Sequence, residues 1–160
     1  MKFLSLVSCL LSLTACGFAP MYSDARALHM ELSDIYIEPI AGTNGIDLRN
    51  HLIMNWRTPN NPGAKYVLRV LLLEPVTVYK GLRRSGDATW EEVRMTAQWS
   101  LSDGETVIAK SAESAAESYT FVADLVSANA AKISAEQNAI RSIGDKIEQK
   151  VNAKVKNRGS

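Results

Sequence analysis

The clearest structural pattern in this chain is Val93-Arg94-Met95-Thr96-Ala97-Gln98-Trp99-Ser100-Leu101. Its apolar residues occupy every second position and alternate with polar ones. Successive side chains of a β-strand point to opposite faces, so this spacing places all the apolar side chains on one face. The stretch therefore predicts a strand with one face in a core and the other in water.

The segments on either side also read as strands. Residues 66–79 are the most β-rich part of the chain and have few polar breaks, which predicts a central strand covered on much of both faces. Pro75 predicts a bend or bulge within it. After residue 101, Ser102-Asp103-Gly104-Glu105 is typical of a hairpin turn, and residues 106–119 follow as a further strand.

Helical spacing appears in two places. Leu48, Leu52 and Trp56 predict a helix after a short strand at residues 34–40, with Asn44 or Asp47 as its cap. Prolines and a glycine in residues 58–63 end this helix. Residues 123–155 contain no proline and repeat isoleucine and valine at mostly helical spacing, which predicts a long amphipathic helix that could reach beyond the sheet toward a partner.

The resulting order β-α-β-β-β-α predicts an α+β two-layer sandwich, with two helices packed on a four-stranded mixed sheet. One domain is expected over residues 34–155, followed by a frayed tail at residues 156–160. The chain has 160 residues, and 46% of them are hydrophobic, which suffices for a single core.

The N-terminus reads as a lipoprotein signal peptide over residues 1–15. A short apolar run follows Lys2 and ends in Leu13-Thr14-Ala15-Cys16, where the thiol of Cys16 can take a diacylglyceryl group before cleavage. The run is shorter than the ~20 apolar residues of a membrane-spanning helix. Residues 16–33 are then the lipidated N-terminus and a tether.

Two alternatives compete with this interpretation. Cleavage before Cys9 would leave an apolar region below the ~7–15 residues that such signals use, and a plain secretory signal would not need a cysteine after Leu-Thr-Ala. Cleavage before Cys16 leaves one cysteine in the mature chain, so no intrachain disulfide can form. The sulfur is then consumed by the lipid, which anchors the domain to a membrane.

Charge and composition argue against several functions. Removal of Lys2 with the signal leaves 17 basic and 17 acidic residues, so no excess of positive charge favours nucleic acid. His29 and His51 lack a metal-ligand motif, and Glu91 and Glu92 are adjacent, which puts them on opposite faces of a strand. The tryptophans are interpreted as core or interface anchors. The sequence predicts no enzyme, metal or cofactor, and favours binding or assembly.

A basic loop is the remaining candidate site. Lys80, Arg83 and Arg84, with Arg94 just beyond, could gather donors for a phosphorylated ligand. The alternative is a solvated hairpin end, which is what most charged loop tips are. Loops carry function more often than cores do, so both interpretations stay open.

The run Cys16-Gly17-Phe18-Ala19-Pro20-Met21-Tyr22 resembles the mature start of the LPS-assembly lipoprotein family (LptE type), typically Cys-Gly-Phe-x-Pro-Leu-Tyr. The order of elements is also similar to that family's. The resemblance implies a lipoprotein on the periplasmic side of the cell outer membrane that plugs and helps assemble a β-barrel translocon (LptD type) and takes part in lipopolysaccharide delivery. It also implies lipopolysaccharide contacts near strand-connecting loops, for which Lys80, Arg83, Arg84 and Arg94 are candidates by position and charge.

Two other functions remain open at this point. A lipoprotein subunit of a lipid-transporting ABC system can share this size and pattern and would bind a periplasmic partner. A tethered structural protein of the envelope is the second alternative. The residues after Cys16 favour the LPS-assembly resemblance over both.

Overall fold

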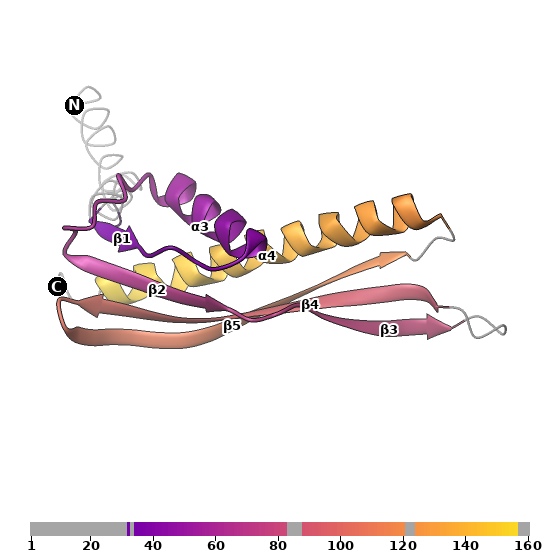
Figure 1. The fold of residues 1–160 in the computed structure, drawn as a ribbon. Coiled ribbons are helices and arrows are strands. Elements are labelled where there is room, and N and C mark those ends of the chain that lie inside the picture. The colour runs from indigo at the N-terminus through magenta and orange to yellow at the C-terminus, as the bar shows by residue number, and fades with distance from the viewer. Residues whose placement is uncertain (1–31, 33, 83–87, 121–123, 157–160) are drawn as a thin grey trace, which may run out of the picture.

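The computed structural model describes residue 32 and residues 34–82, 88–120 and 124–156, and places two helices on one face of a five-stranded sheet (Figure 1). This arrangement confirms the predicted α+β two-layer sandwich. The elements are, in order, β1 (Ile35–Ile37), α3 (Thr43–Trp56), β2 (Tyr66–Leu72), β3 (Val76–Leu82), β4 (Ala88–Asp103), β5 (Thr106–Thr120) and α4 (Leu125–Lys156).

The sheet is built around β4, which contains the alternating stretch. β5 pairs antiparallel with β4 along nearly its whole length. On its other side, β4 pairs antiparallel first with β3 and then with β2, which follow one another along the same edge. β1 adds to β2 in parallel, so the sheet is mixed, as predicted.

The number of strands differs from the prediction of four, because residues 66–79 form parts of two strands. Leu73 N–H still donates to Thr96 O at 2.9 Å, and pairing resumes at Val76, opposite Arg94. Pro75 has no N–H for the ladder and lies in the gap, so the predicted bend became a full interruption.

The predicted cap of the first helix is wrong. Gly42 is the N-cap residue, with a φ of 81° and no side-chain hydrogen bond to the helix. Asn44 therefore lies within the first turn, where its side-chain Nδ2 donates to Glu136 Oε2 of α4 at 3.4 Å. The long C-terminal helix was predicted to within two residues at its start and one at its end.

The hairpin turn between β4 and β5 is also confirmed, although its centre is one residue later than the Asp-Gly pair. Asp103 pairs with Thr106, which makes Gly104 and Glu105 the two central residues. Gly104 has a φ of 57°, a conformation that glycine adopts at no steric cost.

The molecule divides along its length into two regions (Figure 1). We call the compact half the part formed by β1, α3, β2, residues 97–103 of β4, residues 106–113 of β5 and residues 139–156 of α4. We call the arm the part formed by β3, residues 88–94 of β4, residues 116–120 of β5 and residues 125–135 of α4. The main core lies in the compact half and includes Leu32, while Val93, Tyr119 and Ala135 form a small separate core in the arm.

Candidate functional site

The alternation of β4 gives the sheet an inner face toward the helices and an outer face that no described element covers. Met95, Ala97 and Trp99 are buried on the inner face. Glu92, Arg94 and Gln98 alternate with these residues and lie on the outer face. This confirms that Glu91 and Glu92 lie on opposite faces.

Two of the predicted contact residues meet on the outer face of the arm. Glu92 Oε1 lies 3.4 Å from Lys80 Nζ and 3.0 Å from Arg94 Nη2. One carboxylate thus faces two cations, which leaves one positive charge in this group. Both cations are partly exposed and can exchange the carboxylate for another anion at little cost, because exposed ion pairs are weak. Arg83, Arg84 and Cys16 lie outside the described residues.

A groove of about 530 Å³ crosses the outer face of the compact half. The strand register aligns Arg69, Ser100 and Lys110 in one cross-strand row. The next row holds Leu71, Gln98 and Ala112. The groove therefore combines two cations with apolar surface, although both Arg69 Nε contacts go to the carboxylate of Glu38 at 3.0 Å. Sequence reasoning missed this groove, because Arg69 and Lys110 meet only through strand pairing.

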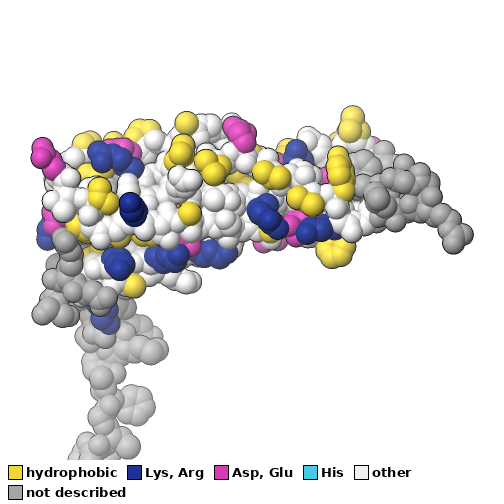
Figure 2. Space-filling model, turned by 90° about the horizontal axis from the view of Figure 1, so that it is seen from below, with side chains coloured by type: hydrophobic (Ala, Val, Ile, Leu, Met, Phe, Trp, Pro, Cys, Tyr) yellow, Lys and Arg dark blue, Asp and Glu magenta, His cyan; other side chains and the backbone are white. Residues whose placement is uncertain are grey.

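Hydrophobic side chains also run along the outer face (Figure 2). Leu71 and Val76 are more than half exposed, and Trp90 is 51% exposed near the end of the arm. The prediction that the tryptophans are core or interface anchors holds for Trp56 and Trp99, which are buried. Extending the alternation of β4 backward would have placed Trp90 on the outer face with Glu92 and Arg94.

The same alternation places Glu91 on the inner face of the arm, where it is buried. Tyr119 O–H donates a short hydrogen bond to Glu91 Oε2. Burial, and then this hydrogen bond, raise the pKa of Tyr119 above its ordinary range. The pair satisfies a buried carboxylate within the small core of the arm.

Glu113 is the corresponding buried carboxylate of the compact half. Its Oε1 accepts from Trp99 Nε1 at 3.2 Å and lies 2.7 Å from Lys150 Nζ of α4. Burial by itself would raise the pKa of Glu113, but the hydrogen bonds from Lys150, Trp99 and Ser111 outweigh it and lower the pKa. This group ties α4 to the sheet.

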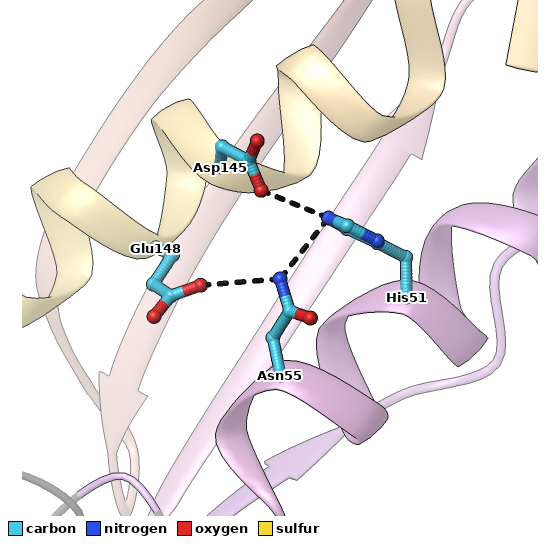
Figure 3. A network of polar contacts seen from close by, with 4 residues as sticks. All are labelled: His51, Asn55, Asp145 and Glu148. Atoms are coloured by element: carbon cyan, nitrogen blue, oxygen red, sulfur yellow. Dashed lines mark hydrogen bonds and ion pairs between the residues drawn. The ribbon is translucent and has the colours of Figure 1, made fainter. Parts of the chain in front are cut away.

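A polar network joins the two helices (Figure 3). His51 Nε2 lies 3.0 Å from Asp145 Oδ1 and 3.2 Å from Asn55 Nδ2. Asn55 Nδ2 also donates to Glu148 Oε2 at 3.4 Å. Gly144 lets the helices approach here, since an added Cβ would lie 2.4 Å from His51 Cδ2. We interpret the network as a helix–helix contact with no nucleophile beside it.

The described residues bring together no group of three or more His, Cys, Asp or Glu side chains that could hold a metal ion. None of the described helices combines the length and the apolar character needed to cross a membrane. What the described surface offers is an open sheet face with cations, small polar residues and apolar side chains. Such a surface can bind a ligand or a partner.

This arrangement defines a small α+β protein with an elongated mixed sheet, two helices on one face and an open second face. No family model matches the chain, and none of the curated proteins matches it by sequence.

Comparison with solved structures gives clear likenesses, several of them to lipoproteins. A candidate lipoprotein of Caulobacter crescentus CB15 superposes with a TM-score of 0.66 at 20% identity, covering 81% of this chain and 96% of that one. Rare lipoprotein B of Shewanella oneidensis gives 0.63 at 11% identity, covering 79% and 98%. A minor lipoprotein of Acinetobacter baumannii gives 0.57 at 22% identity, covering 74% and 90%.

These likenesses confirm that the chain has the fold of rare lipoprotein B and similar lipoproteins, as the N-terminal resemblance implied. At 11–22% identity they show the fold and leave the ligand and partners to other arguments.

Proposed function

We propose that this protein is an outer-membrane lipoprotein, anchored through a lipid on Cys16, that plugs and helps assemble a β-barrel lipopolysaccharide translocon. The observation that carries the proposal is the agreement of two independent features. The run after Cys16 resembles the LPS-assembly lipoproteins, and the fold is that of rare lipoprotein B. Neither feature depends on the other, because the run lies outside the described residues.

The outer face supports a role in lipopolysaccharide delivery. Lipopolysaccharide carries phosphates and acyl chains, so its contacts need cations beside apolar surface. Lys80 and Arg94 lie on the same face as Leu71 and Val76. We propose that Lys80 and Arg94 act together with Arg83 and Arg84, which belong to the connection between β3 and β4.

Purification in mild detergent tests the main proposal. We expect a large outer-membrane barrel to co-purify with the protein from its own membranes, because a plug inside a barrel is retained when the bilayer is removed. Mass spectrometry of the complex identifies the partner. Recovery of an ABC permease without a barrel would favour a transport subunit and refute the proposal.

Charge reversal tests the ligand contact. Replacement of Lys80, Arg83, Arg84 and Arg94 by Glu is expected to weaken lipopolysaccharide binding at least tenfold, with most of the loss at low salt. Equilibrium binding of purified lipopolysaccharide is the measurement. A matched variant reverses four exposed basic residues on the helix side, Arg57, Arg141, Lys154 and Lys156, and should bind normally. Equal binding by the two variants would remove the predicted residues from the site.

A further inference from the structure

β5 and β3 lie on opposite sides of β4, and each has a long edge that faces away from β4. The two edges differ in the side chains that contact them. The free edge of β5 is covered by side chains from α4. Lys146 Nζ donates to Ser114 O at 2.6 Å, and Lys150 Nζ donates to Ser111 Oγ at 3.0 Å. Lysines at a sheet edge prevent another strand from pairing there. β5 is therefore a blocked edge.

The free edge of β3 has no such cover. Leu73 N–H donates to Thr96 O, so the backbone N–H and C=O of Thr96 point toward the side of β4 where β2 and β3 lie. Every second residue of a strand points the same way, so the backbone groups of Arg94 also point to this side. Val76 lies opposite Arg94 and pairs with it. Backbone groups alternate in direction along an antiparallel pair, so the N–H and C=O of Thr77 and Tyr79 point away from β4.

The space beside β3 is a strand position that no described element fills. β1 pairs with β2 only as far as Leu68, where Glu38 N–H donates to Leu68 O at 3.0 Å. Beyond that point, β4 is the only described strand that pairs with β3. The position beside β3 in the arm can therefore accept one more strand.

Each face of this edge carries one large exposed side chain that is mainly apolar. Val76 is 58% exposed on the outer face, and Tyr79 is 66% exposed on the inner face beside Glu91. When two antiparallel strands pair, each residue lies opposite a residue of the other strand, with the two Cβ atoms ~4.5–5.5 Å apart. A strand placed here would cover both side chains and the unpaired backbone groups together.

We propose that the edge of β3 binds an extended segment of a protein partner as an additional β-strand. A row of alternating N–H and C=O groups matches another peptide backbone, which supplies both donors and acceptors at the strand spacing, whereas a lipid does not. This inference rests on the proposed function, which makes the partner the barrel protein. A closed barrel leaves no free edge in its wall, so the segment lies outside the wall.

Hydrogen exchange of the full-length protein, alone and in the co-purified barrel complex, tests this inference at single amides. We expect the amides of Thr77 and Tyr79 to exchange at least tenfold more slowly in the complex, because they gain hydrogen-bond partners. The amide of Ala112 points outward from β5 in the same way, between the two residues that the lysines of α4 contact, and serves as the control. Its exchange should change less, because that edge takes no strand.

Proline substitution gives an independent test in the same complex. Thr77→Pro removes an edge N–H that β4 does not use, so the fold should survive. We expect at least tenfold less barrel to be recovered with this variant. Ala112→Pro is the matched control on the blocked edge and should recover normal amounts. Circular dichroism checks that both variants fold. If Thr77→Pro does not fold, hydrogen exchange of the wild-type protein in the complex decides whether the edge of β3 binds a strand.

The outcomes separate the two proposals. If the barrel co-purifies while Thr77 and Tyr79 exchange as in the free protein, the edge inference is wrong and the proposed function stands. If no barrel co-purifies, the proposed function fails, and this occupant of the edge fails with it. Protection that appears in the protein alone, together with a dimer mass, would identify a second copy as the occupant and refute the inference.

Discussion

The compact half and the arm share β4, β5 and α4 but bury very different amounts of apolar surface. Among the described residues, twenty form the main core, whereas three form the separate core of the arm, so the stability of the fold must reside mainly in the compact half. In the arm only α4 runs along the sheet among the described helices, while both α3 and α4 lie over the sheet of the compact half (Figure 1). Leu125 and Val126 at the start of α4 are accordingly about four-fifths exposed.

This difference teaches where binding surface can come from. A half-covered sheet leaves apolar side chains and backbone groups without partners, and those are the groups that a partner can use. Regions with few buried contacts also open locally at low free energy. We therefore expect the arm to exchange its amides faster than the compact half, and to lose that difference in a complex.

Core truncation should give the largest contrast between the two regions. Leu52→Ala, in the compact half, is expected to lower the free energy of unfolding by ~2–5 kcal/mol, because the residue is fully buried in the main core. Val93→Ala removes less volume from the arm and should cost about 1 kcal/mol. Denaturant unfolding measures both values.

A matched substitution removes the difference in side-chain size. Val151 is as fully buried as Val93 but belongs to the main core. Val151→Ala should therefore lower the stability of the whole fold more than Val93→Ala does. Equal losses would contradict the view that the compact half carries the stability.

Close packing at Gly45 should give the next largest effect. A Cβ at this position of α3 would lie 2.8 Å from Ile40 Cγ2 and 2.9 Å from the Ile40 backbone. The backbone cannot turn aside as a side chain can, so Gly45→Ala should cost ~1–3 kcal/mol despite the better helix propensity of alanine. Thermal unfolding tests this.

Gly63→Ala is the control for that measurement, since its Cβ would meet only the Asn61 side chain, at 3.5 Å. It should be neutral or slightly stabilising, because alanine restricts the unfolded chain. A stable Gly45→Ala protein would mean that Ile40 can shift.

The smallest effects concern pH, and the two regions should weaken at opposite ends of the scale. The pKa of Glu113 in the compact half is lowered on folding. Its contribution is present above the unfolded value of ~4.3 and is lost as pH falls through the folded value. Unfolding at pH 3–7, followed by Trp99 fluorescence, should show a loss that Glu113→Gln reduces.

The arm should weaken in alkali. The pKa of Tyr119 is raised on folding, so its contribution is complete below the unfolded value of ~10 and is lost as pH rises toward the folded value. Tyr119→Phe should abolish this dependence and cost ~1–3 kcal/mol at neutral pH, because Glu91 stays buried without its donor. Hydrogen exchange of the arm amides measures the cost. An alkaline loss that persists in Tyr119→Phe would assign it to another group.

The elements were largely predictable from sequence because their periods are local. Alternation in β4 and helical spacing in α4 each follow from one stretch of chain. The sequence correctly predicted that Pro75 disturbs the strand. That the strand is interrupted there depended on where the chain pairs with β4 again, at Arg94. The helix cap was wrong because Gly42, with its positive φ, begins the helix before the polar residues that could have capped it.

The candidate site was predictable only in part. Lys80 and Arg94 were singled out from the sequence and lie together in the structure, but the carboxylate of Glu92 between them was not singled out. Arg69 and Lys110 were not singled out, because residues on different strands become neighbours through the pairing register. The exposed position of Trp90 was available from the alternation and was missed.

The sequence by itself determined the two-layer α+β class, the extent of the long helix, the face of each residue in β4 and the resemblance at Cys16 to Tyr22. These depend on short periods and on a contiguous motif. Only the tertiary structure decided that β2 and β3 share one side of β4, that lysines of α4 contact Ser111 and Ser114 of β5, and that β3 has no second neighbour among the described strands. The reason is physical: hydrogen-bond directions and edge cover depend on which strands pair and in what register, and no local period carries that information.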